Sequence, residues 1–151
     1  MQLKGIGISI GVMAMFGASL PVIADTTPED AKDYRAAIMT TLGGHIGAAS
    51  MVVRGLVDDN GQLVAHAAGL ANGAAELENV FQEGSNVGES EALPAIWEKP
   101  EEFAEAIQAL VEATAVLEEA AASGEQEAIG AAFREVGMSC RGCHDNFRQS
   151  D

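Results

Sequence analysis

The chain has 151 residues, with 23 acidic and 8 basic side chains, so its formal charge is -15. This excess of acids excludes a nucleic-acid binder, because phosphate contacts need clustered lysine and arginine. Aromatic residues make up only 5%, and much of the 48% hydrophobic content is alanine, which favours close-packed helices over a sheet. Two cysteines are too few for the disulfide framework of a small secreted domain.

The first 24 residues have the pattern of a secretory signal peptide. Lys4 is the only charge in an otherwise apolar segment, which ends in small residues before a cut after Ala24. An uncleaved anchor is the alternative, but the apolar run is short, and a membrane span needs about 20 apolar residues. We therefore expect a signal peptide at 1–24, a single exported domain at 25–151, and no membrane span after cleavage.

Thr27, Pro28 and Glu29 predict the start of the first helix, with a capping hydroxyl, a proline at the first helical position and an acid at the positive dipole end. Apolar residues follow at helical spacing, and we expect one buried face made of Tyr34, Ile38, Leu42, Ala49, Val52 and Leu56. Each glycine of Gly43–Gly44 costs the helix up to about 1 kcal/mol relative to alanine. We therefore expect this pair to mark a close approach of another helix.

A second helix is predicted from Gln62 to Phe81, where leucines recur at seven-residue spacing. Glycines and prolines then interrupt the pattern over residues 83–99. This stretch is too long for a tight turn, so it indicates a crossover connection, with Ile96 and Trp97 as anchors onto the core.

A third helix is predicted to begin near Pro100, and its expected buried face consists of Phe103, Ile107, Leu110, Thr114 and Leu117. Ser123 and Gln126 form a capping-box pattern, which predicts the start of a fourth helix. The apolar face of that helix consists of Ile129, Phe133, Val136, Cys140, Cys143 and Phe147. Four amphipathic helices predict an all-α antiparallel four-helix bundle, with a looser helical array as the alternative.

Cys140, Cys143 and His144 form the C-x-x-C-H pattern of c-type haem attachment. Two thiols at this spacing can add to the two vinyl groups of one porphyrin, and the adjacent histidine can place a ring nitrogen under the iron. Because both cysteines lie on the apolar face of the fourth helix, the porphyrin would be inserted into the bundle core.

Three other interpretations of this motif remain open. A thioredoxin-type redox pair needs a βαβ context, which the sequence does not show. A zinc site would use Cys140, Cys143 and His144 but has no obvious fourth ligand. A simple disulfide would leave His144 without a role. Export favours the haem, since c-type attachment is completed outside the bacterial cytoplasm.

The position of the motif near the C-terminus resembles the class II c-type cytochromes, and most closely the cytochrome c′ family. The resemblance covers residues 27–151 and rests on the segments Glu29–Arg35, Met39, Gly44–Gly47, Pro94–Trp97 and Cys140–Arg148. It implies a periplasmic four-helix bundle, often a homodimer, with one covalently attached haem c. It also implies a five-coordinate, high-spin iron that binds nitric oxide and carbon monoxide. The expected role is gas binding or electron transfer to an unidentified redox partner, rather than enzymatic catalysis.

The resemblance further assigns residues to the distal side of the haem, opposite His144. Met39 occupies the distal position, where a thioether either covers the iron sterically or ligates it as in low-spin electron carriers; the family pattern favours the cover. Phe81 resembles a second distal wall residue, although core packing also explains it. Arg35 is placed near the haem propionates or the cavity, since a guanidinium matches carboxylate geometry.

Arg148 follows His144 by four residues, one helical turn further along the same face. The resemblance marks it as a proximal arginine that could tune the iron potential and donate hydrogen bonds to a ligand; the alternative is a cation that complements the helix dipole. We expect structural or surface roles for His45 and His66. Arginines at 134, 141 and 148 make the haem helix less acidic than the rest, which either steers a charged partner or serves solubility alone.

Overall fold

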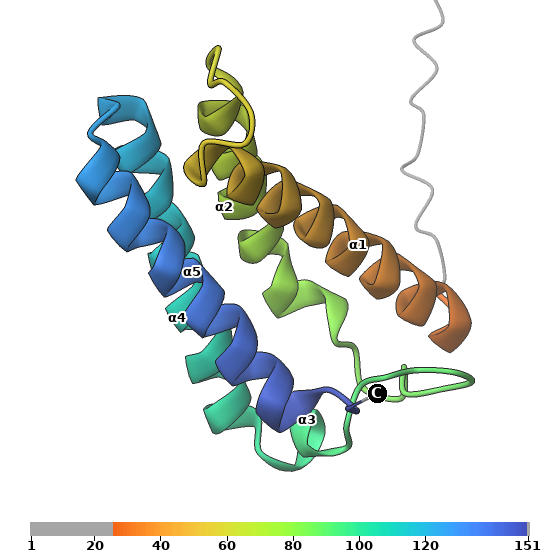
Figure 1. Ribbon diagram of the computed structural model, residues 1–151. Coiled ribbons are helices and arrows are strands. Elements are labelled where there is room, and N and C mark those ends of the chain that lie inside the picture. The colour runs from red at the N-terminus through yellow and green to blue at the C-terminus, as the bar shows by residue number, and fades with distance from the viewer. Residues whose placement is uncertain (1–25, 151) are drawn as a thin grey trace, which may run out of the picture.

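The computed structural model describes residues 26–150, so the predicted signal peptide at 1–24 lies outside the described residues. The described helices are α1 (Pro28–Val53), α2 (Gln62–Val80), α3 (Ala95–Glu98), α4 (Pro100–Ser123) and α5 (Gln126–Phe147). The four long helices form an antiparallel bundle, which confirms the predicted all-α fold (Figure 1). The short helix α3 lies within the predicted crossover connection.

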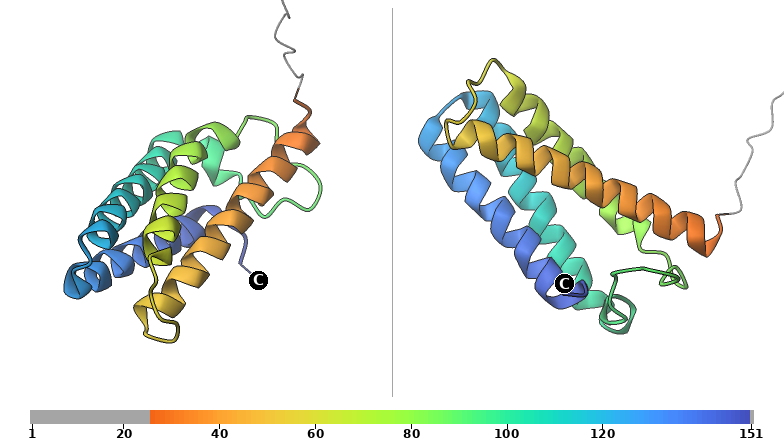
Figure 2. Two further views of the ribbon diagram at one scale, coloured as in Figure 1. Left: turned by 90° about the horizontal axis from the view of Figure 1, so that it is seen from above. Right: turned by 45° about the vertical axis from the view of Figure 1, so that its right-hand side comes forward.

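The bundle consists of two helix pairs, α1 with α2 and α4 with α5, which are joined by packing of α2 against α4. The contact between α1 and α5 is small. These two helices diverge toward the end of the molecule where the C-terminus lies (Figure 1 and the right-hand view of Figure 2). The haem motif of α5 lies toward this end, so the space between α1 and α5 positions the candidate site.

The helix starts were predicted with mixed success. Thr27 caps α1 as expected, since its hydroxyl oxygen accepts a hydrogen bond from the backbone N–H of Asp30 at 3.1 Å. The predicted capping box at Ser123 is wrong, because Ser123 is the last residue of α4 and α5 begins at Gln126 without a side-chain cap. Gly124 ends α4 in the left-handed conformation, with φ of 73°, which glycine adopts at little cost.

The core confirms the predicted face of α4, whose five named residues are all buried, as are the leucines of α2 at 63, 70 and 77. Ile96 is also buried, which confirms it as an anchor of the crossover. The predicted face of α1 is only partly right. Ala49 is buried, but Tyr34 is 55% exposed, and Leu56 is 59% exposed because it lies beyond the end of the helix.

The close helix approach predicted at Gly43–Gly44 is wrong, because a Cβ atom on either glycine would meet nothing within 4 Å. The close approach occurs on α2 instead, where a Cβ on Gly69 would lie 2.5 Å from the ring of His45. His45 is held there by His66, since the two Nδ1 atoms are 3.1 Å apart and one imidazole donates to the other. His45 therefore joins α1 to α2, in agreement with the structural role expected for it.

By length and composition α1 is apolar enough to cross a membrane, so the expectation that no such segment follows the signal peptide is wrong on this criterion. In the described structure α1 packs against α2 and carries the buried Arg35. It therefore forms one helix of the bundle.

The His45 contact predicts opposite effects for two glycine substitutions. Gly69→Ala should lower the free energy of unfolding by about 1–3 kcal/mol, because the new methyl group would overlap a ring held by His66. The matched control, Gly47→Ala, should instead raise it by about 0.5–1 kcal/mol, because this site on α1 has room, lies outside the cavity lining and alanine favours the helix. Urea unfolding of both variants checks this, and equal effects would contradict it.

Candidate cofactor site

A cavity of about 580 Å³ between α1 and α5 brings together every site residue predicted from the sequence. Its lining includes Arg35, Met39, Phe81, Cys140, Cys143, His144 and Arg148. The remaining wall is largely apolar and includes Leu42, Ile46, Leu70, Leu77, Phe103 and Phe147. The side chains come from all four long helices, so the folded bundle is required to assemble the site.

The two cysteines lie half-buried near the end of α5, and both are free thiols. Burial raises the pKa of Cys140, and burial together with the neighbouring Cys140 raises the pKa of Cys143 to about 11. Protonated thiols do not match a reactive redox pair, in which the pKa is lowered. The zinc interpretation also lacks support, since among the described residues no three His, Cys, Asp or Glu side chains are grouped to hold a metal ion.

His144 lies at the rim of the same cavity. Partial burial and the positive charge of Arg148 lower the pKa of its imidazole, while the charges of Asp145 and Glu91 partly oppose this. The imidazole is therefore held in its neutral form, which is the form that binds iron through a ring nitrogen.

Arg35 is buried, with 6% of its surface exposed, although its guanidinium carries a charge. It donates to Ser85 Oγ at 2.7 Å, to the Ser85 carbonyl at 3.0 Å and to Ser90 Oγ at 3.1 Å. Within residues 26–150 no carboxylate pairs with this guanidinium, and burial lowers its pKa. A buried cation with only neutral partners suits a cofactor that brings its own carboxylates.

Phe81 directly follows the last residue of α2 and contributes to both the cavity and the core. Its ring lines the cavity and packs edge-on against Phe103, with 4.7 Å between ring centroids. The indole nitrogen of Trp97 donates to the Phe81 carbonyl at 3.1 Å, which makes Trp97 the anchor expected in the crossover. Met39 lines the cavity from α1, in a half-buried position packed against the core.

Arg148 occupies a different setting from the one predicted. Its backbone N–H still donates to the His144 carbonyl at 3.1 Å. However, α5 ends at Phe147, and the backbone of Arg148 is in the extended conformation. It forms an isolated antiparallel bridge with Ala92, and its Nε lies 3.1 Å from the Glu91 carboxylate. Sequence reasoning missed Glu91, because no spacing pattern links the crossover to the end of the chain.

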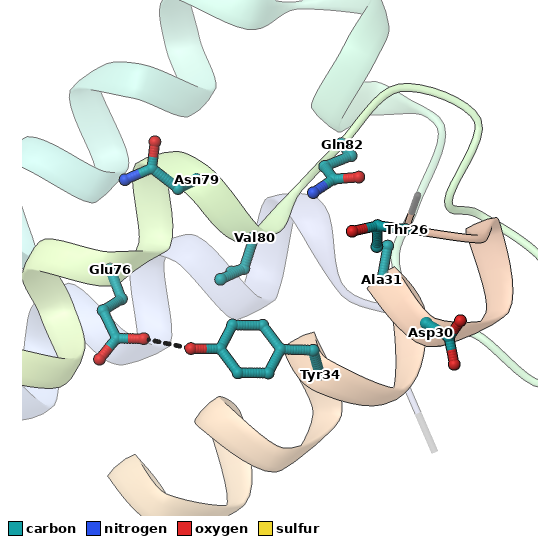
Figure 3. A pocket seen from close by; sticks show the side chains of 8 residues that line it. All are labelled: Thr26, Asp30, Ala31, Tyr34, Glu76, Asn79, Val80 and Gln82. Atoms are coloured by element: carbon teal, nitrogen blue, oxygen red, sulfur yellow. Dashed lines mark hydrogen bonds between the residues drawn. The ribbon is translucent and has the colours of Figure 1, made fainter. Parts of the chain in front are cut away.

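A second cavity of about 590 Å³ lies between the start of α1 and the end of α2 (Figure 3). There the Tyr34 hydroxyl donates to the Glu76 carboxylate at 2.8 Å, and this hydrogen bond raises the pKa of Tyr34. None of the predicted site residues lines this cavity.

Residues 30–148 match the family model described as "Cytochrome C'". The chain belongs to the cytochrome c′ family. Cytochrome c′ of Pararhodospirillum photometricum is 32% identical over 125 residues, which cover 82% of this chain and 99% of that relative. Among solved structures, the nitric oxide complex of a point mutant of cytochrome c prime from Alcaligenes xylosoxidans aligns with a TM-score of 0.76 and 33% identity, covering 82% of this chain and 97% of that one. A carbon monoxide-bound variant of the same protein gives a TM-score of 0.76 and 34% identity, covering 82% and 98%.

Members of the cytochrome c′ family carry one covalently attached haem c, and the residues of this chain fit that group. The cavity offers an apolar wall for the porphyrin, two thiols at the attachment spacing and a neutral imidazole beside them. It also offers a buried guanidinium with no carboxylate partner among the described residues.

The hydrogen bonds of Arg35 predict that lysine cannot replace it. Arg35→Lys should lower the free energy of unfolding of the haem-loaded protein by about 1–3 kcal/mol, because one ammonium group cannot serve Ser85 and Ser90 together. Arg54→Lys, at the exposed end of α1, should change it by less than about 0.5 kcal/mol. Denaturant unfolding compares the two variants, and equal losses would show that the loop contacts of Arg35 contribute little.

Proposed function

We propose that this protein is a periplasmic monohaem c-type cytochrome that binds diatomic gases at a five-coordinate iron. The observation that carries the proposal is the single cavity that gathers Cys140, Cys143 and His144 from α5 and Met39 from α1. Family membership supports the haem, and the predicted signal peptide supports export.

Each residue then has a chemical role. The thiols of Cys140 and Cys143 would hold the haem through two thioether bonds, each formed by addition of one S–H across one vinyl group, and His144 would bind the iron through a ring nitrogen. Arg35 binds a propionate, since its buried guanidinium lacks a carboxylate partner among the described residues. When bound, the haem supplies an iron that takes up a diatomic ligand or one electron.

Met39 would cover the side of the iron opposite His144 without binding it, and Phe81 would form a second wall there. Both side chains line the cavity and are half-buried. A thioether can also ligate haem iron, and the placement of Met39 in the cavity keeps a low-spin electron carrier as the second candidate function.

The ligand class is supported by the relatives, because solved structures named as nitric oxide and carbon monoxide complexes share this fold at 33% and 34% identity. A homodimer and a charged redox partner are further parts of the proposal. Arg134 and Arg141 are exposed on the haem helix and form no ion pair with another described residue, so they offer positive charge on an acidic protein.

Optical spectroscopy of the purified protein tests the proposal. A broad ferrous band that changes on addition of carbon monoxide is expected for a five-coordinate, high-spin iron. Sharp, split ferrous bands that carbon monoxide leaves unchanged would favour the low-spin carrier. Absence of a Soret band would contradict both functions.

Truncation of Met39 tests its steric role. Met39→Ala should increase the affinity for carbon monoxide, because removing the thioether opens the distal side without removing an iron ligand. The matched control is Met51→Ala, which truncates a methionine of the same helix that is 48% exposed and lies outside the cavity lining. Carbon monoxide titration measures both affinities, and an unchanged affinity in Met39→Ala would remove Met39 from the distal wall.

A further inference from the structure

The crossover and the end of the chain are joined just beyond α5. The Leu93 N–H donates to the Phe147 carbonyl at 2.9 Å, and the Gln149 N–H donates to the Glu91 carbonyl at 2.7 Å. These bonds flank the bridge between Ala92 and Arg148. The backbone position of Arg148 is therefore set by the crossover as well as by α5.

The side chain of Arg148 is held by the same segment. Its Nε lies 3.1 Å from Oε2 of Glu91, and both residues line the cavity together with His144. The backbone N–H of Arg148 also donates to the His144 carbonyl at 3.1 Å, which keeps the two residues adjacent. A carboxylate that binds Nε restricts the rotation of the whole guanidinium, because the contact is made at the inner nitrogen of the group.

We propose that Glu91 is the positioning residue of the proximal arginine and fixes the guanidinium of Arg148 beside His144. The inference rests on the proposed function only in taking a haem iron bound by His144. It assigns to the crossover, in addition to the haem helix, control over the position of the cation beside His144.

The first experiment observes the Nε–H group of Arg148 directly by NMR in the haem-loaded protein with labelled arginine. The ferrous form under carbon monoxide is suitable for NMR, because six-coordinate ferrous iron is diamagnetic and does not broaden the signal. This holds whether the sixth ligand is carbon monoxide or Met39. In Glu91→Ala, solvent exchange of this proton should be faster by about twofold to fivefold, the range expected for an exposed ion pair. Glu89→Ala, which removes the same charge from the same loop and cavity but not the partner of Arg148, should leave the exchange rate unchanged.

The second experiment measures whether Glu91 acts on the iron through Arg148. Arg148→Ala should lower the midpoint potential, because removing a nearby cation stabilises the ferric state. This lowering should be smaller in a Glu91→Ala background, where the contact between Glu91 and the guanidinium is absent, and full in a Glu89→Ala background.

Two results would overturn the proposal. The first is an exchange rate of the Arg148 Nε–H proton that Glu91→Ala leaves unchanged. The second is a lowering of the midpoint potential by Arg148→Ala that is the same in the wild-type, Glu91→Ala and Glu89→Ala proteins. Neither result depends on gas binding, so failure of the positioning role and failure of the proposed function are distinguishable. Equal thermal midpoints and equal haem content of Glu91→Ala and Glu89→Ala exclude a general loss of structure; the Glu91 side chain is 63% exposed.

Discussion

A single buried guanidinium joins the parts of the chain that surround the cavity. Arg35 extends from α1 and bonds to the loop that follows α2, through Ser85 and Ser90. Its guanidinium carbon also lies 5.3 Å from the centre of the Phe81 ring. Since α1 packs mainly against α2 and has little contact with α5, these bonds add a direct link from α1 to the loop at the edge of the cavity. A charge this deeply buried is costly unless it is paired, so the same interaction that closes the distal side creates a demand for an anion there.

The two sides of the cavity are built by different segments of the chain. The side that carries Met39 and Phe81 is built by α1 and the residues at the end of α2, whereas the side that carries His144 is built by the end of α5. The crossover reaches both sides, because Ser90 binds Arg35 and the adjacent Glu91 binds Arg148. Two neighbouring loop residues therefore contact the arginines on opposite sides of the cavity.

The four long helices and the location of the site could be predicted from the sequence, because both depend on local information. Helical periodicity identifies the buried face of α4, and the C-x-x-C-H motif places three chemically active residues within five positions. The predictions failed where a neighbouring residue or a distant segment decides the structure. Gly124 ends α4 after Ser123, so the serine could not cap the next helix. Glu91 meets Arg148 only after the chain has folded.

The packing of the His45 ring against Gly69 has a consequence for how the cavity can change during evolution. The ring of His45 and the side chain of Leu42 lie against Gly69 and Gly73 of α2, and these contacts fix how far α1 is shifted along its neighbour. Met39 lies one helical turn before Leu42, so its position in the cavity depends on glycines that do not line the cavity. Ligand preference can therefore diverge between related proteins through substitutions on α2 while every residue that touches the ligand stays the same.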